Sequence, residues 1–599
     1  MKKRILFALL SLGMLSSCDL TESMQVQADK AMIFGSESGL DLYINSFYKA
    51  LPTLGTGYML DDMCDIAAVS DVNSFIREGA YTSETSTSWS WTTLRNINYF
   101  IDSCNDPDYC TVDDDVKSNA IAIARWFRAW FYYDKLTTYG EVPWFENEIQ
   151  SYETDLMYKD RDSRDVIIAN MISDLDYAYE NISAKSSTGS SMVTKWAAAA
   201  LKSRVCLFEA SYRKYHELTG MTYSAADLYA EAASAAKLVM DNSGLALNTS
   251  SGTKGAYRDL FYLENPIESE VILAVCANAD SGITGSANWW YNSSSYGHRW
   301  SLSKAFMNTY LMLDGSFFTS QTAYDQKLLY QEVAGRDERI EQTIRGAEFT
   351  MDGALTVANV KSVSLTGYQV IKYTLDESAY DGTSNNNNSI PLIRYAEVLL
   401  NYAEAKAELG TLTDSEWKTT IGAIRSRAGI TGGLDMVPTT IDSYLQSTFY
   451  PNVTDPTILE IRRERTIELV AEGFRFDDLR RWKCGESMQD LPWDGIYIGA
   501  LDQPIDVNND GTYDYYFTQD SSLDNVASTY KSIAIQVDQS DTGLGVIAAG
   551  TNTYTLTYKW PSNDRYWYTD GRQYLYPIPA SVIRSYEAEG YTLSQNANW

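Results

Sequence analysis

Apolar residues recur at helical spacing through much of the chain. Residues 121–136 are apolar on nearly all sides, which predicts a buried helix, and a glycine followed by a proline ends the pattern. Other helices are expected wherever apolar residues return every three or four positions. These segments are 38–50, 94–103, 165–179, 194–212, 224–240, 394–404 and 458–470.

The pattern changes in the second half of the chain. Residues 245–388 are rich in loop-forming residues with one predicted strand at 271–277, and short strands and turns follow from about residue 495. Alanine clusters in 194–212 and 224–240 allow close contact between helices, so irregular helical hairpins similar to tetratricopeptide pairs are expected. We therefore predict a mainly α protein. A helical scaffold would span 37–245, and a loop-rich, partly β ligand-binding region with interleaved helices would span 246–599.

Residues 458–482 combine two predicted helices, a glycine break and a dense set of charges. Gly473 stands just after the first helix, where a left-handed residue can release the chain. Asp477 and Arg481 are spaced to pair across one helical turn. Charges of alternating sign favour internal ion pairs over the alternative, a catalytic or phosphate site. These charges belong to Arg462, Arg463, Glu464, Arg465, Glu468, Glu472 and Arg475.

The N-terminus has the pattern of a bacterial lipoprotein signal. Three basic residues precede an apolar run over 5–15, and Leu-Ser-Ser-Cys ends at Cys18. A transmembrane helix is the alternative, but the run is shorter than the roughly 20 apolar residues that span a bilayer. We expect cleavage after residue 17, lipid on Cys18, a polar tether over 18–36, and attachment of the folded body to a membrane face.

Charge and composition exclude several classes of function. Loss of residues 1–17 leaves 45 Lys and Arg against 79 Asp and Glu, so the mature chain carries a net charge of −34. A field of this sign disfavours nucleic acid and favours neutral ligands. Only two histidines are present and no cysteines have metal-ligand spacing, so neither a histidine triad nor zinc is expected. Cys104 and Cys110 are close enough in sequence to form a disulfide, although free buried thiols are equally consistent with the pattern.

Aromatic side chains suggest where a ligand would bind. The chain has 15 Trp and 44 Tyr against 18 Phe, a balance that favours rings able to stack on sugars and to form hydrogen bonds at their edges. The densest cluster lies in 288–300, which is expected to be an exposed binding loop. About half of its aromatics should instead fill the core, with Trp300 the first of them. The candidate ligand contacts in this segment are Trp289, Trp290, Tyr291, Tyr296 and Arg299.

A second candidate site lies in the polar loop over 81–91. Trp89 is the expected ligand contact, whereas Trp91 is expected to pack where the next helix begins. Arg77 and Asn73 are candidate partners for ligand hydroxyl groups. These assignments rest on local composition.

Residues 506–514 resemble part of an EF-hand loop. Oxygen-bearing side chains stand at loop positions 1, 3, 5, 7 and 9 with a glycine at position 6, but Phe517 replaces the bidentate acid at position 12. A structural calcium ion and a simple hairpin turn are both consistent with this spacing. The candidate metal ligands are Asp506, Asn508, Asp510, Thr512 and Asp514.

Several of these segments also match the signatures of one protein family. The run Arg462-Arg463-Glu464-Arg465 through Trp482 resembles the R-R-E-R-x-x-E-L signature of the SusD/RagB family of outer-membrane nutrient-binding lipoproteins. Other matches are Arg128-Ala129 through Val142-Pro143 and the helix that begins Arg394-Tyr-Ala-Glu. The endings Tyr574-Leu-Tyr-Pro-Ile-Pro and Leu593-Ser-Gln-Asn-Ala-Asn-Trp599 match as well, so the resemblance extends along the whole chain.

The resemblance implies a function of binding and not of catalysis, with no required cofactor. The protein would capture oligosaccharides at the exterior of the outer membrane and deliver them to a SusC-like TonB-dependent transporter. Because binding residues vary between members, no motif assigns them here. One alternative is a RagB-like protein that carries peptides to the same kind of transporter. Another is a surface glycosidase, which would need two carboxylates flanking an aromatic cleft.

Overall fold

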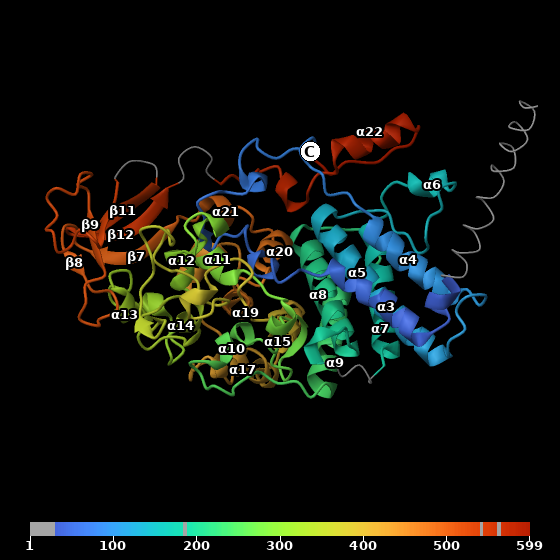
Figure 1. Cartoon of the computed structure of the whole chain (residues 1–599), viewed down its shortest axis with the longest axis horizontal. Helices are drawn as coiled ribbons and strands as arrows, with labels where there is room; N and C mark the ends of the chain where they lie inside the picture. The colour runs from blue at the N-terminus through green and yellow to red at the C-terminus, as the bar shows by residue number, and fades with distance from the viewer. Residues whose placement is uncertain (1–29, 184–188, 539–542, 560–564) are drawn as a thin grey trace, which may run out of the picture.

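The structure is a computed structural model that describes residues 30–183, 189–538, 543–559 and 565–599. A helical end and a β-rich end lie at opposite sides of the molecule, with further helices between them (Figure 1). The mainly α character expected from the sequence is confirmed. The helical end contains α3 (Glu37–Asn45), α4 (Thr92–Asn105), α5 (Asp114–Tyr139), α6 (Thr154–Met157), α7 (Arg164–Asn181), α8 (Lys195–Tyr215) and α9 (Ala225–Asn242).

Successive long helices pack against one another as a continuous array. α5 contacts α7, α7 contacts α8, and α8 contacts α9. The array continues into the second half of the chain, because α9 also contacts α15 (Tyr395–Glu408), which in turn contacts α19 (Pro456–Glu468). The alanine clusters of α8 and α9 are largely buried, which explains the close approach of these two helices. The tetratricopeptide-like scaffold is therefore present and extends beyond residue 245.

The rest of the second half consists of short elements. The predicted strand is present as β2 (Val271–Val275), which pairs antiparallel with β6 (Ile390–Arg394). At the β-rich end, β7 (Asp494–Gly499), β11 (Gly543–Gly550) and β12 (Thr553–Lys559) form one three-stranded sheet, in the order β11-β12-β7. A second sheet has the order β10-β9-β8. Its strands are β8 (Pro504–Ile505), β9 (Tyr515–Thr518) and β10 (Ala534–Gln536).

Short helices and strands connect these parts. The helices are α10 (Ala256–Tyr262), α11 (Ala287–Asn292), α12 (Lys304–Met307), α13 (Leu329–Val333), α14 (Arg339–Thr343), α16 (Asp414–Thr419), α17 (Ile421–Arg427), α18 (Ser443–Phe449), α20 (Arg475–Arg481), α21 (Ser487–Asp490) and α22 (Ala580–Ala588). The strands are β1 (Ala67–Ala68), β3 (Ser301–Leu302), β4 (Thr350–Met351) and β5 (Ala354–Leu355).

Two large hydrophobic cores exchange segments between the two halves. Residues 54–76 belong to the core that is otherwise built from the second half of the chain. Ile578, Tyr586 and Leu593 return to the core of the first half. The folded body also begins before the end of the expected tether, because Phe34 is fully buried with its ring centre 5.7 Å from that of Phe100.

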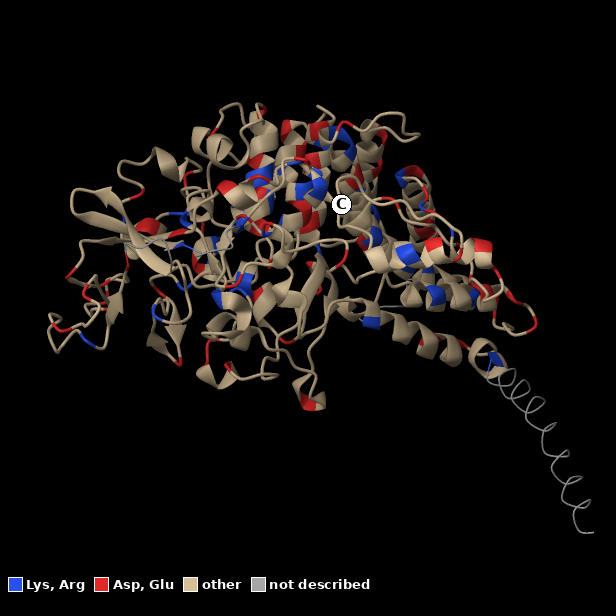
Figure 2. Ribbon diagram, turned by 90° about the horizontal axis from the view of Figure 1, so that it is seen from above, with Lys and Arg blue, Asp and Glu red and all other residues tan. Residues whose placement is uncertain are grey.

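The charged segment around α19 is an internal ion-pair network, as the alternating signs predicted. The buried carboxylate of Glu468 accepts hydrogen bonds from Arg339 at 2.8 Å and from Arg394 and Arg427. Figure 2 shows blue and red positions interleaved along the helices near the centre of the molecule. Because each of these charges is buried, removal of any one partner should destabilise the protein strongly.

One predicted pair in this segment is wrong. Asp477 pairs with Arg480 and not with Arg481. The guanidinium of Arg481 instead points into the protein, where it contacts Asp478 at 2.8 Å and Glu404. Arg481 is 2% exposed, so buried carboxylates compete for it more effectively than the partly exposed Asp477 does.

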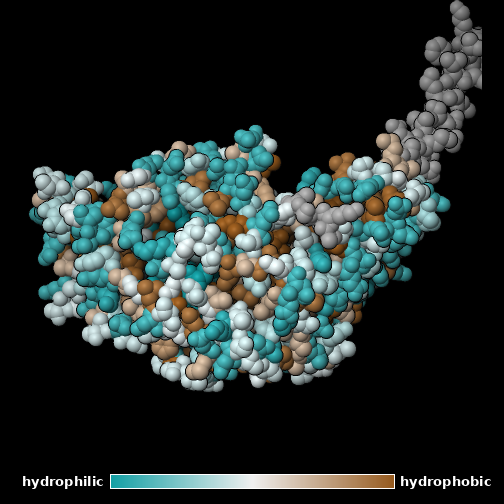
Figure 3. Space-filling view, turned by 90° about the horizontal axis from the view of Figure 1, so that it is seen from below, coloured by the Kyte–Doolittle hydropathy of each residue, from teal (hydrophilic) through white to brown (hydrophobic). Residues whose placement is uncertain are grey.

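Figure 3 shows that the apolar surface seen from below gathers mainly in the middle of that face, while hydrophilic residues cover most of the two ends.

In the described part of the chain, no helix is both long enough and apolar enough to cross a bilayer. The expected signal peptide and the expected lipid attachment at Cys18 lie outside the described residues. Cys104 and Cys110 are buried thiols in contact with each other, and burial raises the pKa of Cys104.

Candidate ligand-binding site

The segment expected to be an exposed binding loop forms a short helix. Residues 287–292 are α11, and the buried side chain of Asn288 fixes it by donating to the Leu375 carbonyl at 2.9 Å and accepting from the Leu375 amide at 2.7 Å. Trp290 and Tyr291 are each 5% exposed. Their assignment as exposed ligand contacts is therefore wrong, because the helical turn directs them into the core.

Two other residues of this segment remain accessible. Trp289 and Tyr296 are half-buried, and their rings stack with centroids 3.7 Å apart. Trp300 is buried as expected, and its indole N–H donates to the carbonyl of Asp61 at 3.1 Å. The stacked pair is the part of the segment that a ligand could reach.

Arg299 positions a neighbouring loop. Its guanidinium donates to the carbonyl oxygens of Val360 and Ser364, each at 3.3 Å. Burial lowers the pKa of Arg299 below its usual value. Most N–H donors of Arg299 are therefore bonded to backbone carbonyl groups and not directed at a ligand.

The structure brings the segment around Asn73 close to this helix. β1 pairs with β3, and the amide of Ser70 donates to the carbonyl of His298 at 2.6 Å. Asn73 itself accepts from the Phe75 amide at 3.0 Å, so it caps a local turn. Arg77 forms a backbone bridge with Arg565. Asn73 thus follows the strand that pairs with β3, whereas Arg77 lies against the C-terminal segment at Arg565.

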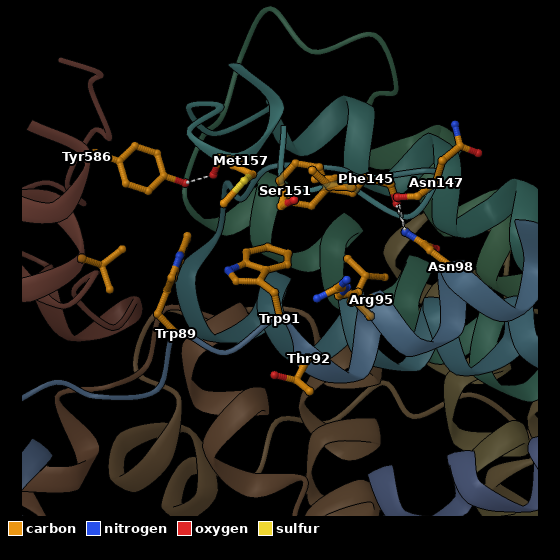
Figure 4. A pocket seen from close by; sticks show the side chains of 13 residues that line it. Trp89, Trp91, Thr92, Arg95, Asn98, Phe145, Asn147, Ser151, Met157 and Tyr586 are labelled. Carbon is orange, nitrogen blue, oxygen red and sulfur yellow. Dashed lines mark hydrogen bonds between the residues drawn. The ribbon is translucent and has the colours of Figure 1, made fainter. Parts of the chain in front are cut away.

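Trp89 lines a separate pocket at the helical end (Figure 4). The pocket has a volume of about 450 Å³, within the range of small-molecule sites. Its walls are mostly apolar and aromatic. The lining residues are Trp89, Trp91, Thr92, Leu94, Arg95, Asn98, Phe145, Asn147, Ile149, Ser151, Met157, Val582 and Tyr586.

Aromatic rings form an angled wall in this pocket. The indoles of Trp89 and Trp91 meet edge to face, with centroids 5.3 Å apart and planes at 74°. Trp91 also meets Phe145 edge to face at 5.5 Å. Trp91 precedes the first residue of α4, which agrees with its expected position at the start of the helix. Such contacts hold the rings rigid without covering all of their faces.

Hydrogen bonds fix the opposite wall to α4. The Asn98 amide donates to the carbonyls of Phe145 at 2.8 Å and Asn147 at 3.1 Å. Arg95, whose side chain is 65% exposed, pairs with Glu148 at 3.2 Å. Arg95 lines the pocket, and its remaining N–H groups can donate to a ligand oxygen.

The C-terminal helix closes the pocket. Figure 4 shows Tyr586 reaching from α22 toward Met157, whose carbonyl accepts from its hydroxyl at 3.3 Å. Burial raises the pKa of Tyr586 to about 12, so the hydroxyl stays protonated and remains a donor at neutral pH.

Sequence reasoning found Trp89 but missed most of this pocket. Residues 145–157 and 582–586 follow Trp89 by more than 50 and more than 490 positions in the chain, and no local pattern joins them. One signal was present, because Trp89 and Trp91 alternate with polar residues just before an amphipathic helix.

The calcium candidates form a hairpin turn between β8 and β9. Asp506 accepts from the amide of Gly511 at 2.9 Å, and Asp514 accepts from the amide of Val507 at 2.8 Å. Burial and the neighbouring carboxylates raise the pKa of Asp514 to about 6. Across the described residues, no group of three or more acidic, His or Cys side chains is arranged to hold a metal. The calcium hypothesis therefore rests on the sequence spacing alone.

Comparison with known proteins identifies relatives. The model of the SusD family matches residues 269–599. A SusD-like protein of Bacteroides ovatus is 26% identical over 393 residues, which are 62% of this chain and 60% of that protein. The alignment thus spans less than two thirds of that relative.

Solved structures share the fold over nearly the whole chain. A SusD-like protein of Bacteroides fragilis is 19% identical, with a TM-score of 0.63 over 95% of this chain and 98% of its own. A second B. fragilis structure, described as a SusD-like carbohydrate-binding protein, is 20% identical, with a TM-score of 0.61 over 93% of this chain and 98% of its own.

Proposed function

Because this chain belongs to the SusD family, we propose that it binds oligosaccharides in the pocket of Trp89 and Trp91. The supporting observation is the pair of partly exposed indoles set at 74° in a pocket of about 450 Å³. A sugar ring has apolar C–H faces that pack on indole, and each such platform contributes roughly 1–3 kcal/mol if stacking on bases is a guide. Two platforms together with hydrogen bonds to the sugar hydroxyl groups would give binding in the micromolar to millimolar range.

Neutral sugar units suit this pocket best. Among its described lining residues Arg95 alone is charged, and it already pairs with Glu148. Arg95 and the edge of Trp89 offer N–H donors to hydroxyl oxygens. The relative described as a carbohydrate-binding protein supports the same ligand class.

We propose delivery of the bound glycan as the biological role. The N-terminal sequence predicts lipid on Cys18, which would hold the protein at the outer membrane, facing the cell exterior. The partner proposed from the family is a SusC-like TonB-dependent transporter. The folded body would then present glycans to the transporter.

Binding without turnover is part of the proposal. Hydrolysis of a glycosidic bond requires a pair of carboxylates around the scissile bond. Among the described residues that line the pocket, none is Asp or Glu. Bound glycans should therefore be released without cleavage.

Calorimetric titration of the mature, unlipidated protein with neutral oligosaccharides, acidic oligosaccharides and a peptide digest tests this function. We expect heat with a neutral glycan, and a loss of at least tenfold in affinity in Trp89→Ala. Trp289→Ala is the matched control, because it removes another half-buried indole outside the pocket.

Three outcomes would contradict the proposal. Glycan affinity lost in Trp289→Ala and kept in Trp89→Ala would move the site to the stacked pair beside α11. Heat with peptides alone would replace the carbohydrate ligand by a peptide. Shortened glycans after incubation would show turnover.

A further inference from the structure

A second pocket lies where the helical array meets the second half of the chain. It has a volume of about 550 Å³, and it receives residues from α5, from the start of α4 and from the turn between α19 and α20. The two pockets share one wall, because Trp89 and Trp91 line the first while Ser90 and Thr93 line the second. None of its lining residues belongs to the binding site proposed above.

Lys135 supplies a weakly paired cation to this pocket. Its side chain is only 9% exposed, yet its nearest carboxylate oxygen in the described part of the chain, on Asp134, is 3.7 Å away. That separation is longer than a direct hydrogen bond. The ammonium also lies 5.2 Å from the ring centre of Phe131 and 5.7 Å from that of Tyr139, but these uncharged rings do not neutralise it. Burial of an unpaired ammonium group costs free energy, and an anionic partner would offset that cost.

Other basic groups at the pocket are already neutralised. Arg204 forms a bidentate ion pair with Glu397, in which both hydrogen bonds are 2.7 Å long. Arg480, next to the pocket, is bound by Asp477. Lys135 is therefore the cation to which an incoming anion would bind.

The acidic groups limit how much negative charge a ligand can carry. Glu472 is held by Lys372 at 2.7 Å, whereas Asp134 is 68% exposed and faces water. Asp134 repels a polyanion such as a sulfated or phosphorylated chain. Its carboxylate can nevertheless accept hydrogen bonds from ligand hydroxyl groups.

Aromatic side chains complete the pocket. Trp130, Phe131 and Tyr133 are partly exposed along α5, and Phe474 contributes from the turn after α19. These rings offer apolar faces beside Lys135. A hydroxylated sugar ring with one apolar C–H face and one carboxylate satisfies the aromatic wall, the cation and the hydroxyl acceptor at once.

We propose that this pocket binds an acidic sugar unit of the uronic acid type, with its carboxylate on Lys135 and its hydroxyl groups facing Asp134. The inference rests on the proposed function in one respect, namely that the ligand is a carbohydrate. It adds a second site and a charge preference that the pocket of Trp89 does not provide. A glycan carrying both neutral and uronic units would engage the protein at two places.

The test is titration of the mature, unlipidated protein with trigalacturonate and with the neutral galactotriose. We expect Lys135→Met to weaken trigalacturonate binding at least tenfold and to leave galactotriose binding within twofold. Lys418→Met is the matched control, because it removes the same charge from an exposed ion pair with Asp435. Trp89→Ala should leave trigalacturonate binding in place.

A second measurement uses the unaltered protein, in case Lys135→Met does not fold. Trigalacturonate should slow acetylation of Lys135, measured by mass spectrometry of peptides, and should leave acetylation of Lys418 unchanged. Absence of both binding and protection would overturn the second site. So would trigalacturonate binding that survives Lys135→Met.

The two proposals fail separately. Galactotriose or another neutral glycan that binds through Trp89, together with no trigalacturonate binding, would overturn the second site alone. Trigalacturonate binding that Lys135→Met removes would support the second site even if no neutral glycan binds. Absence of binding by every glycan tested would overturn both.

Discussion

The indole of Trp91 contacts the ring of Phe131 with centroids 5.7 Å apart, and these two side chains line different pockets. Trp91 stands at the start of α4 and Phe131 lies on α5. The contact is therefore part of the wall between the two proposed sites. Rings that pack in this way transmit displacement, since neither can move without opening a void.

Trp91→Ala should weaken binding at both pockets and lower stability. The change removes contacts with Phe131, Tyr132 and Phe145, and loss of a large aromatic from such a cluster costs roughly 3 kcal/mol. Urea unfolding measures the stability, and titration with galactotriose and trigalacturonate measures the two sites. Trp89→Ala is the control, because it should affect the first pocket only. Unchanged trigalacturonate affinity in Trp91→Ala would show that the wall does not couple the sites.

Gly473→Ala should destabilise the turn that carries Phe474 into the second pocket. Gly473 has φ = +87°, and a Cβ there would lie 2.6 Å from the Cβ of Leu60. Backbone strain and this clash together should cost roughly 2–4 kcal/mol. Gly499→Ala is the matched control, since Gly499 also has positive φ but no atom within 4 Å of its Cβ site. The control should lose only about 1 kcal/mol in urea unfolding, and equal losses would exclude the clash.

The sequence was sufficient for the helices but not for the sites. Helical spacing located α5, α8, α9, α15 and α19 because each buries an apolar stripe that the sequence displays directly. The alternating charges around Glu468 indicated ion pairs. Which partners meet was not predictable, because Arg339 and Arg427 reach Glu468 from distant segments.

Composition was misleading at the aromatic cluster of 288–300. Its Gly, Ser and Asn residues suggested a loop, but buried Asn288 uses its amide to satisfy backbone groups of Leu375 and so anchors a helix. Side chains that satisfy buried backbone groups look the same in sequence as exposed loop residues.

The pockets could not be predicted from the sequence for a different reason. Trp89 and Tyr586 share one pocket across almost 500 residues of chain.

Removal of the carboxylate of Glu468 should severely destabilise the protein. Arg339, Arg394 and Arg427 all bind this group, and each is nearly inaccessible to water. Their positive charges hold the pKa of Glu468 well below its usual range. Glu468→Gln removes the one carboxylate that all three buried arginines share, although each keeps another acidic partner, and this should cost roughly 3–5 kcal/mol.

Urea unfolding of Glu468→Gln beside Asp241→Asn provides the measurement. Asp241 pairs with Lys237 on the surface, where both side chains are about half exposed, so its loss should cost less than about 1 kcal/mol. Similar losses in the two variants would show that the internal network contributes no more than a surface pair.

His216 should make the protein less stable as the pH falls from about 6.5 to about 4. Its ring stacks on Tyr212 with centroids 4.0 Å apart, and its Nε2–H donates to the Arg480 carbonyl at 2.8 Å. Burial lowers the pKa of His216 to about 4, from 6.5 in the unfolded chain. Between these values the unfolded chain binds a proton that the folded protein does not, so acid favours unfolding. The full shift corresponds to at most roughly 3 kcal/mol.

Urea unfolding at intervals from pH 7 to pH 4, for the parent and for His216→Gln, isolates this effect. Carboxylates that titrate in both proteins cancel in the difference between their free energies of unfolding. Above pH 7 the parent should be the more stable, because glutamine cannot reproduce the ring stacking on Tyr212. That advantage should shrink as the pH falls and level off below about pH 4, where histidine is protonated in both states. A difference that stays constant across the range would mean that His216 titrates alike in the folded and unfolded protein.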